Sequence, residues 1–397
     1  MASHAIGPRW DSAFNMILSG CREIQKVLTP HQSWISPATA TSMERTGFNP
    51  SSIDLSTKFK LTHYRSARAQ HADAFDLCAM VERMRCLTLL GLCLITTVCA
   101  AQQSAPRTGS VHTADVDIAT FSYGPAAAAG ATPIIVVNGG PGLSHVYLIH
   151  NDVWTRRVAE QRPVIFYDQR GTGASRISHA GVSQSMEAQV ADLEAVRASL
   201  HAEKVDLAGD SYGGLLASAY TAAHPEHVNA LILSDSAAPG IPLVHPRLDE
   251  AFPDVVAQVK EESARLAGQP GAEARIAELD LRAHMRMLFY SQQMFERYRA
   301  DPAGLGFNAE TGDAVSAAIK TLDLTPQMKQ FHLPTLVLQG RFDLNVTPDI
   351  SWMVAHTVPG AELVWFEKSG HLPYYEEPDK YVQVVTTFLK AHDPASR

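Results

Sequence analysis

The pentapeptide at residues 209–213, Gly-Asp-Ser-Tyr-Gly, places a serine between two glycines. It follows a short apolar run and precedes a helical pattern at 212–223. A serine in this position is typical of a nucleophile elbow, because small neighbours let strand and helix approach and leave the hydroxyl exposed above the sheet. Ser211 is therefore the candidate nucleophile of an acyl-transfer reaction. The alternative is an ordinary loop serine, since the five-residue pattern alone is common.

A nucleophilic serine needs a base, and the base needs an acid that orients it. His371 and Asp343 each come directly after a late predicted strand. The chain order serine, acid, histidine is the order expected for this kind of site. Ser211, Asp343 and His371 are thus the predicted catalytic residues. Asp235, which also follows a predicted strand, is a rival acid, and its alternative role is a turn or helix cap.

A second glycine-rich motif, Asn-Gly-Gly-Pro-Gly at residues 138–142, directly follows a predicted strand. Glycines let the backbone turn its N–H groups towards a substrate oxygen. We expect the N–H groups of Gly140 and Tyr212 to form an oxyanion hole. Gly139 is an alternative to Gly140 as the first donor, and a plain strand-ending turn is the alternative for the whole motif.

From about residue 110, short apolar runs alternate with helical patterns, which predicts an α/β fold with a mostly parallel sheet covered on both faces. The predicted strands are 133–137, 163–167, 205–208, 230–234, 334–339 and 362–366, and the predicted helices are about 185–200, 212–223 and 376–391. The alternation breaks at about 240–330, a helical and charged stretch that we expect to form a cap over the carboxyl ends of the strands. The core would then comprise residues 110–239 and 331–395.

With these motifs the chain resembles the α/β-hydrolase fold family, and within it the prolyl aminopeptidase (proline iminopeptidase) group of serine peptidases with their tricorn-interacting-factor relatives. The Gly-Gly-Pro-Gly at 139–142 and the Asp-Gln-Arg-Gly-Thr-Gly-Ala-Ser at 168–175 are fairly specific to this branch. The resemblance covers about 110–395 and implies an eight-stranded type of sheet, a helical cap and no cofactor or metal. Asn138 stands where the family usually has histidine, and Asp210 where it has a small residue.

Members of this family recognise the substrate's free ammonium group with carboxylates of the cap, because an ammonium taken out of water needs such partners. The predicted cap offers five glutamates, namely Glu250, Glu261, Glu262, Glu296 and Glu310. Glu296, in an aromatic segment, and Glu310 are our candidates for substrate binding. The alternative for each is an ordinary solvated helix charge.

The resemblance implies a small peptide substrate, cleaved at its N-terminal residue. Two other functions stay open. The same residues would serve a carboxylesterase or lactonase acting on a small ester. A non-catalytic binding protein of this fold is a third reading, although such a protein has no need to keep serine, acid, histidine and glycine motif together.

Composition limits the partners. The chain has 397 residues, 46% hydrophobic and 19% charged, which is a globular composition and excludes a collagen-like or polytopic membrane protein. The formal net charge is −8. An acidic body argues against nucleic acid or an anionic membrane as partner. The sequence leaves the oligomeric state open.

The N-terminal quarter differs from the rest. Residues 1–83 have no sustained period and are expected to be a disordered extension. Residues 84–101 begin Met-Arg and continue as an uncharged apolar run that ends in small residues, as in a secretory signal. The mature enzyme would then begin near Ala101 or Gln102, lose all five cysteines, be exported and keep no membrane span. If this run is instead a buried helix or an anchor, the prediction of export is wrong. Without a signal the protein would be cytoplasmic.

Overall fold

The computed structural model describes residues 105–126, 130–237, 239–240, 248–301 and 306–394. The predicted extension 1–83, the predicted signal 84–101 and all five cysteines lie outside these residues. None of the helices in the described part is long and apolar enough to cross a membrane.

Within the described residues, nine strands form one sheet. The strands are β1 (Arg107–His112), β2 (Val116–Tyr123), β3 (Ile134–Val137), β4 (Val164–Tyr167), β5 (Arg176–Ile177), β6 (Val205–Asp210), β7 (Val228–Ser234), β8 (Thr335–Gly340) and β9 (Glu362–Phe366). Eight of them follow the order β1-β2-β4-β3-β6-β7-β8-β9, and β5 pairs with β2. The strands from β4 to β9 along this path run parallel, and β1, β2 and β5 pair antiparallel. The predicted mostly parallel sheet is confirmed.

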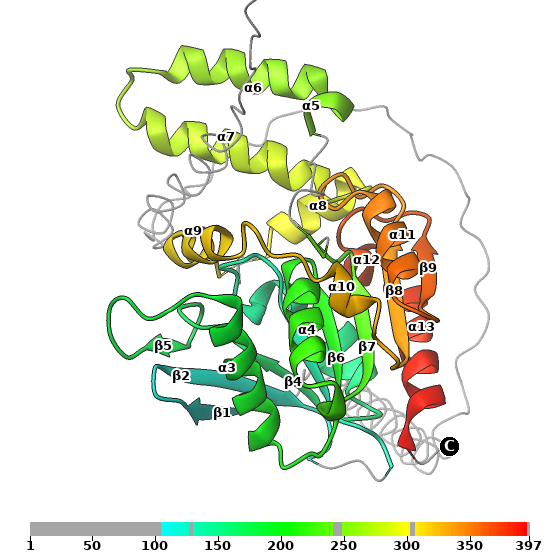
Figure 1. Cartoon of the computed structure of the whole chain (residues 1–397). Coiled ribbons are helices and arrows are strands. Elements are labelled where there is room, and N and C mark those ends of the chain that lie inside the picture. Colours follow the sequence, from blue (N-terminus) through cyan, green and yellow to red (C-terminus); the bar gives the residue numbers. More distant parts are fainter. Residues whose placement is uncertain (1–104, 127–129, 238, 241–247, 302–305, 395–397) are drawn as a thin grey trace, which may run out of the picture. The chain divides into compact units, whose positions relative to one another are not determined.

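The helices fall into two groups (Figure 1). The core group is η1 (His145–Ile149), η2 (Val153–Val158), α3 (Met186–Ser199), α4 (Tyr212–Ala223), η3 (Pro225–His227), α11 (Pro348–Thr357), α12 (Pro373–Glu376) and α13 (Pro378–His392). The group between β7 and β8 is α5 (Leu248–Ala251), α6 (Pro253–Leu266), α7 (Ala272–Met287), α8 (Gln292–Arg299), α9 (Ala309–Ala318) and α10 (Thr325–Met328). We call this second group the cap.

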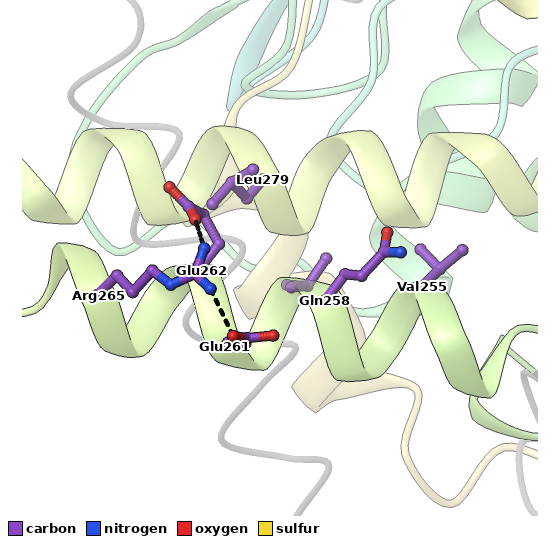
Figure 2. Close-up of a pocket in the computed structure, with 7 residues that line it drawn as sticks. Val255, Gln258, Glu261, Glu262, Arg265 and Leu279 are labelled. Atoms are coloured by element: carbon purple, nitrogen blue, oxygen red, sulfur yellow. Dashed lines mark hydrogen bonds and ion pairs between the residues drawn. The ribbon is translucent and has the colours of Figure 1, made fainter.

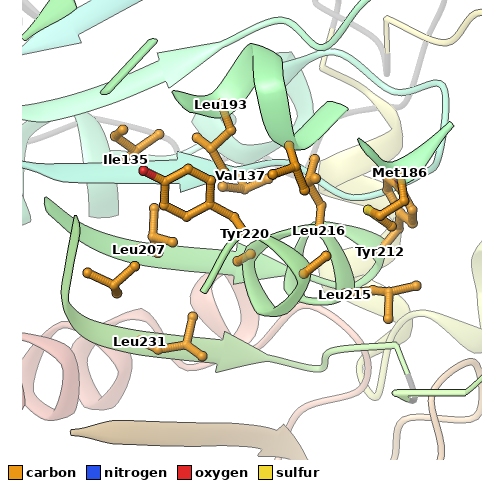
Figure 3. Packing of buried hydrophobic residues seen from close by; sticks show 14 of the residues in the cluster. Ile135, Val137, Met186, Leu193, Leu207, Tyr212, Leu215, Leu216, Tyr220 and Leu231 are labelled. Carbon is orange, nitrogen blue, oxygen red and sulfur yellow. The ribbon is translucent and has the colours of Figure 1, made fainter. Parts of the chain in front are cut away.

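Both faces of the sheet are buried, which explains why the central strands read as continuous apolar runs. All four residues of β3 are buried. Ile135 and Val137 belong to the apolar cluster that α3 and α4 cover, where Figure 3 places Leu193 and Leu216. Ile134 and Val136 belong to the cluster on the other side. Alternate side chains of one strand thus bury against helices on opposite faces.

The cap touches the core where parallel strands end. The N–H of His371, in the loop after β9, donates to the carbonyl of Leu288 at 2.7 Å. The N–H of Asn308 donates to the carbonyl of Gly142, in the loop after β3, at 2.8 Å. The helices between β7 and β8 therefore lie against the carboxyl ends of the strands, as expected for a cap. The exact boundaries at 239 and 331 stay a prediction.

Candidate active site

Ser211 lies at the turn between β6 and α4 with φ 54° and ψ −123°, a backbone conformation that residues other than glycine rarely adopt. Its neighbours must be small. A Cβ on Gly209 would lie 2.5 Å from the carbonyl oxygen of Gly213, and a Cβ on Gly213 would collide with the carbonyl oxygen of Val137. Backbone strain of this kind persists only where the surrounding structure maintains it, and it clusters at functional sites. The elbow predicted from the pentapeptide is present in the backbone.

His371 and Asp343 lie together, although 28 positions separate them in the chain. The Nδ1 of His371 is 2.7 Å from Oδ2 of Asp343, and both side chains are buried. The other oxygen of Asp343 accepts the backbone N–H groups of Asn345 at 2.8 Å and Val346 at 3.0 Å. These two donors hold the carboxylate in place, so that it fixes the imidazole with its Nδ1 protonated.

Asp235, the rival acid, is also close to this pair but has another partner. One potential ligand atom from each of Asp235, Asp343 and His371 falls within 4.8 Å of the others. Oδ1 of Asp235 accepts the N–H of Gly340 at 2.8 Å. Burial, followed by the negative charge of Asp343, raises the pKa of Asp235 well above its ordinary value. Asp343 therefore has the imidazole contact, whereas Asp235 accepts from the backbone of Gly340.

The outer nitrogen of His371 faces an amide. Nδ2 of Asn345 lies 3.3 Å from Nε2 of His371, and among the described residues no hydrogen bond joins the Ser211 hydroxyl to this ring. Burial by itself lowers the pKa of His371, but the charge of Asp343, the hydrogen bond to it and the charge of Asp210 outweigh burial and raise the pKa above 6.5. A neutral ring protonated on Nδ1 leaves Nε2 free to accept a proton, as a general base must.

The two candidate donors after β3 differ in availability. The N–H of Gly139 donates to the Tyr147 hydroxyl at 2.6 Å and is therefore occupied. The N–H of Gly140 donates to no group of the described chain, and this residue is exposed with φ 124°. Tyr212 is the first residue of α4, where an N–H has no intrahelical acceptor. The geometry thus leaves Gly140 and Tyr212, rather than Gly139, as donors for a substrate oxygen.

The motif at 168–175 has a structural role. The buried Arg170 forms an ion pair with Asp192, with Nε 2.7 Å from Oδ2 and a second bond of 2.8 Å to Oδ1. Asp168 accepts from Nδ1 of His145 at 2.8 Å and from the N–H of Ala174 at 2.7 Å. These bonds tie the loop after β4 to α3 and to η1.

The candidate cap glutamates are on the surface. Glu296 is about half exposed on α8 (46%), where its carboxylate pairs with Arg299 at 2.8 Å. Glu310 is exposed in the first turn of α9. Figure 2 shows a hollow between α6 and α7 where Glu261 and Glu262 both pair with Arg265. This hollow contains none of the predicted catalytic residues.

Among the residues that the structure describes, two clusters bring potential metal-ligand atoms together. One is Asp235, Asp343 and His371, described above. The other is Glu194, His224 and His227, on the core helices α3 and η3 and the turn between α4 and η3. The Glu194 carboxylate already accepts from Arg197 at 2.7 Å and from the Tyr220 hydroxyl at 2.5 Å. Hydrogen bonds and ion pairs between protein groups account for both clusters.

Sequence reasoning did not single out three residues that the fold brings to the site. Asn345 contacts His371, as described, and Tyr147 takes up the Gly139 N–H. His284, on α7, has its pKa lowered to about 4, first by burial and then by the charge of His371. Asn345 lies only two residues after Asp343, so its nearness in the sequence was the one signal; no spacing rule connects Tyr147 on η1 or His284 on a cap helix to the catalytic loops.

Comparison with known proteins gives a consistent result. A family model described as alpha/beta hydrolase fold matches residues 132–378. A protein named proline iminopeptidase from Heyndrickxia coagulans is 30% identical over 273 residues, which is 66% of this chain and 92% of that protein. A second protein of that name, from Saccharolobus solfataricus, is 29% identical over 273 residues, covering 64% of this chain and 84% of that protein.

Solved structures agree on the fold. A proline iminopeptidase from Mycobacterium smegmatis superposes with a TM-score of 0.56 at 23% identity, covering 73% of this chain and all of that one. An esterase from Rhodococcus sp. ECU1013 gives a TM-score of 0.58 at 21% identity, with 72% and 99% covered. At such identities the likeness extends to architecture and not to substrate.

Proposed function

Because the chain belongs to the α/β-hydrolase fold family, we propose that it is a serine hydrolase that cleaves an amide or ester bond through an acyl-enzyme. Its preferred substrates would be small peptides, from which it releases an N-terminal proline or small apolar residue. The observation that carries the proposal is the 2.7 Å contact between His371 and Asp343 at the same sheet edge as the Ser211 elbow. The similarity to proteins named proline iminopeptidase supports the substrate class.

In the proposed mechanism Ser211 attacks the carbonyl carbon and gives its proton to Nε2 of His371. Asp343 keeps Nδ1 protonated and stabilises the imidazolium that forms. The N–H groups of Gly140 and Tyr212 bind the oxygen on which negative charge develops. His371 then protonates the leaving amine, and water hydrolyses the acyl-enzyme by the same steps. Every step uses groups of the protein and water.

For proton transfer, Ser211 and the His371 ring must come within hydrogen-bond reach. In the structure Nε2 of His371 faces Asn345 instead, at 3.3 Å. Catalytic hydrogen bonds in substrate-free enzymes are often long and tighten only when substrate is bound. The proposal therefore includes a change of partner, in which the ring exchanges the Asn345 amide for the serine hydroxyl.

Paired substrates test the substrate class. A proline arylamide with a free amine should be cleaved at least about tenfold faster than its N-acetyl derivative. The acetylated compound has no ammonium group, so the carboxylates that bind this group would be left unpaired, which is costly. Equal rates on the free and acetylated compounds would overturn the aminopeptidase reading. A short acyl ester assayed alongside reports the esterase reading directly.

A carboxylesterase or lactonase activity is the second candidate, and one observation favours it. An ammonium taken out of water needs carboxylates that are themselves shielded, but Glu296 and Glu310 are exposed on the cap. A neutral ester substrate makes no such demand. Faster turnover of the acyl ester than of the free proline arylamide would favour this candidate.

We also propose that residues 84–101 direct export, as their charge and apolar pattern predict. A protein starting at Gln102 would then keep the complete hydrolase. Expression of residues 102–397 should give a soluble product as active as the full chain. An inactive product that regains activity when residues 1–83 are supplied would overturn this proposal.

A further inference from the structure

Asp210, the residue before the candidate nucleophile, is a buried carboxylate at a position where the sequence departs from its family. Its exposed fraction is 4%. Oδ2 accepts the hydroxyl of Tyr147 at 2.6 Å, while Oδ1 is buried without a hydrogen-bond partner among the described residues. A buried carboxylate with one unpartnered oxygen is costly. A residue that destabilises the fold beside a nucleophile calls for a functional explanation.

The contacts of Tyr147 connect this carboxylate to the oxyanion loop. The tyrosine hydroxyl has one proton, which it donates to Asp210, so its oxygen is left as an acceptor. That oxygen accepts the N–H of Gly139 at 2.6 Å. A Cβ on Gly139 would lie 2.8 Å from Cβ of Ser211 and 2.9 Å from the Tyr147 hydroxyl, so these groups are in close contact. The chain of bonds runs from Asp210 through Tyr147 to Gly139, the residue before Gly140.

The role that we infer for Asp210 rests on the proposed function and concerns the acyl-transfer reaction. We propose that Asp210 and Tyr147 are positioning residues: the Asp210 carboxylate fixes the direction of the Tyr147 hydroxyl, which holds the Gly139–Gly140 segment so that the Gly140 N–H serves the oxyanion. Without the carboxylate, the hydroxyl could turn its proton towards other acceptors and release Gly139. A donor displaced by a fraction of an ångström loses much of its effect on the transition state.

The Asp210 carboxylate also affects the base, His371, through its charge. Its negative charge is one of the causes that raise the pKa of His371, while burial raises the pKa of Asp210 itself to about 6. The titratable groups in its surroundings are Tyr147, Asp235, Tyr298, Asp343, His371, Tyr374 and Tyr381. Of these, His371 is the group whose protonation state has to change near neutral pH during the reaction.

Four variants separate positioning from general stability. Tyr147→Phe removes the link to Gly139, and Asp210→Leu removes the acceptor for Tyr147. Asp210→Asn keeps an acceptor oxygen but removes the charge. Tyr220→Phe is the matched control, because its hydroxyl also bonds a carboxylate, that of Glu194 on α3 at 2.5 Å, and has no hydrogen bond to Gly139 or Asp210 among the described residues.

We expect Tyr147→Phe and Asp210→Leu to lower kcat by about 10–100-fold with KM within about threefold, since the loss falls on the transition state. Asp210→Asn should keep kcat within about threefold, and the acidic limb of its kcat/KM profile should move to lower pH, because the charge that raises the pKa of His371 is gone. Tyr220→Phe should match the wild type.

A kcat at the wild-type level in Tyr147→Phe or Asp210→Leu would overturn the positioning role. So would an Asp210→Asn variant that is as slow as Asp210→Leu and shows no shift of the limb. If Tyr147→Phe fails to fold, the comparison of Asp210→Asn with Asp210→Leu and its pH profile decides. Each rate is given as a ratio to the wild-type rate on whichever ester or arylamide the wild type cleaves. A wrong substrate class would therefore show in the substrates that the wild type cleaves. A wrong positioning role would show only in the ratios of the variants.

Discussion

The candidate carboxylates of the core and those of the cap differ in their exposure to solvent. Asp210, Asp235 and Asp343 are buried beneath the strand ends, and each accepts a hydrogen bond from the protein. On the cap, Glu296 is half exposed and pairs with an arginine of its own helix, and Glu310 is exposed. Surface pairs of this kind contribute about 0–1 kcal/mol.

This difference separates reaction from selectivity. The core holds its acids in fixed geometries that acyl transfer requires, and those geometries follow from short motifs next to strands. On the cap, the two candidate glutamates, Glu296 and Glu310, lie where water already solvates them. The buried acids of the core therefore support the proposed reaction class, while the exposed glutamates of the cap do not indicate the substrate.

The largest effect should come from the core elbow. Ser211→Ala should lower kcat by about 10⁴–10⁶-fold, because the covalent step is lost while the fold persists. Steady-state rates with a free proline arylamide and a short ester measure this, and thermal unfolding checks the fold. Activity above a few per cent of the wild type would remove Ser211 from its role and end the comparison.

The two buried acids should rank unequally. Asp343→Asn should lower kcat by about 10³–10⁴-fold, because the carboxylate that selects the imidazole tautomer and stabilises the imidazolium is lost. Asp235→Asn should cost much less, since Asp235 bonds a backbone N–H rather than the ring. Kinetics of the two variants side by side test the ranking. The reverse order would move the orienting acid to Asp235.

The pH dependence should report the raised pKa of His371. A base must be neutral, so kcat/KM should fall about tenfold per pH unit below that pKa, and the midpoint of the rise should lie above 6.5. A profile from pH 5 to 9 provides the measurement. A flat profile, or a midpoint well below 6.5, would contradict a histidine base paired with Asp343.

The smallest effects are expected on the cap. Glu296→Gln and Glu310→Gln should each change kcat/KM for a free proline arylamide by less than about threefold, because exposed charges are screened by solvent. A loss of about 100-fold or more in either variant, restricted to substrates with a free amine, would show that the cap rearranges around the ammonium. That result would place substrate recognition on the cap glutamates.

Much of the core could be read from the sequence because burial on both faces gives an unmistakable pattern. The four apolar residues of β3 and residues 230–234 of β7 read as strands without further information. Strand β1 could not be read in this way, since nearly all of its residues are exposed and polar. Helix α11 was not predicted either, although it packs Val354 against the core.

In the site, strand position together with chain order favoured Asp343 and left Asp235 as a rival, but the choice between Gly139 and Gly140 was not available from the sequence. That choice depends on Tyr147, whose hydroxyl occupies one donor and bonds a residue 63 positions away. Long-range contacts of this kind leave no periodicity. Asp210 stood out in the sequence as a departure from the family, but its partner did not.

The central claim is that Ser211 is a nucleophile activated by His371 and Asp343. Labelling with a fluorophosphonate, followed by peptide mass spectrometry, tests it most directly, because the reagent reacts with activated serines whatever the natural substrate. We expect a single modified residue, Ser211, in the wild type, much slower labelling in Asp343→Asn and none in Ser211→Ala. A folded wild-type protein that takes up no label, or a label located on another residue, would contradict the claim.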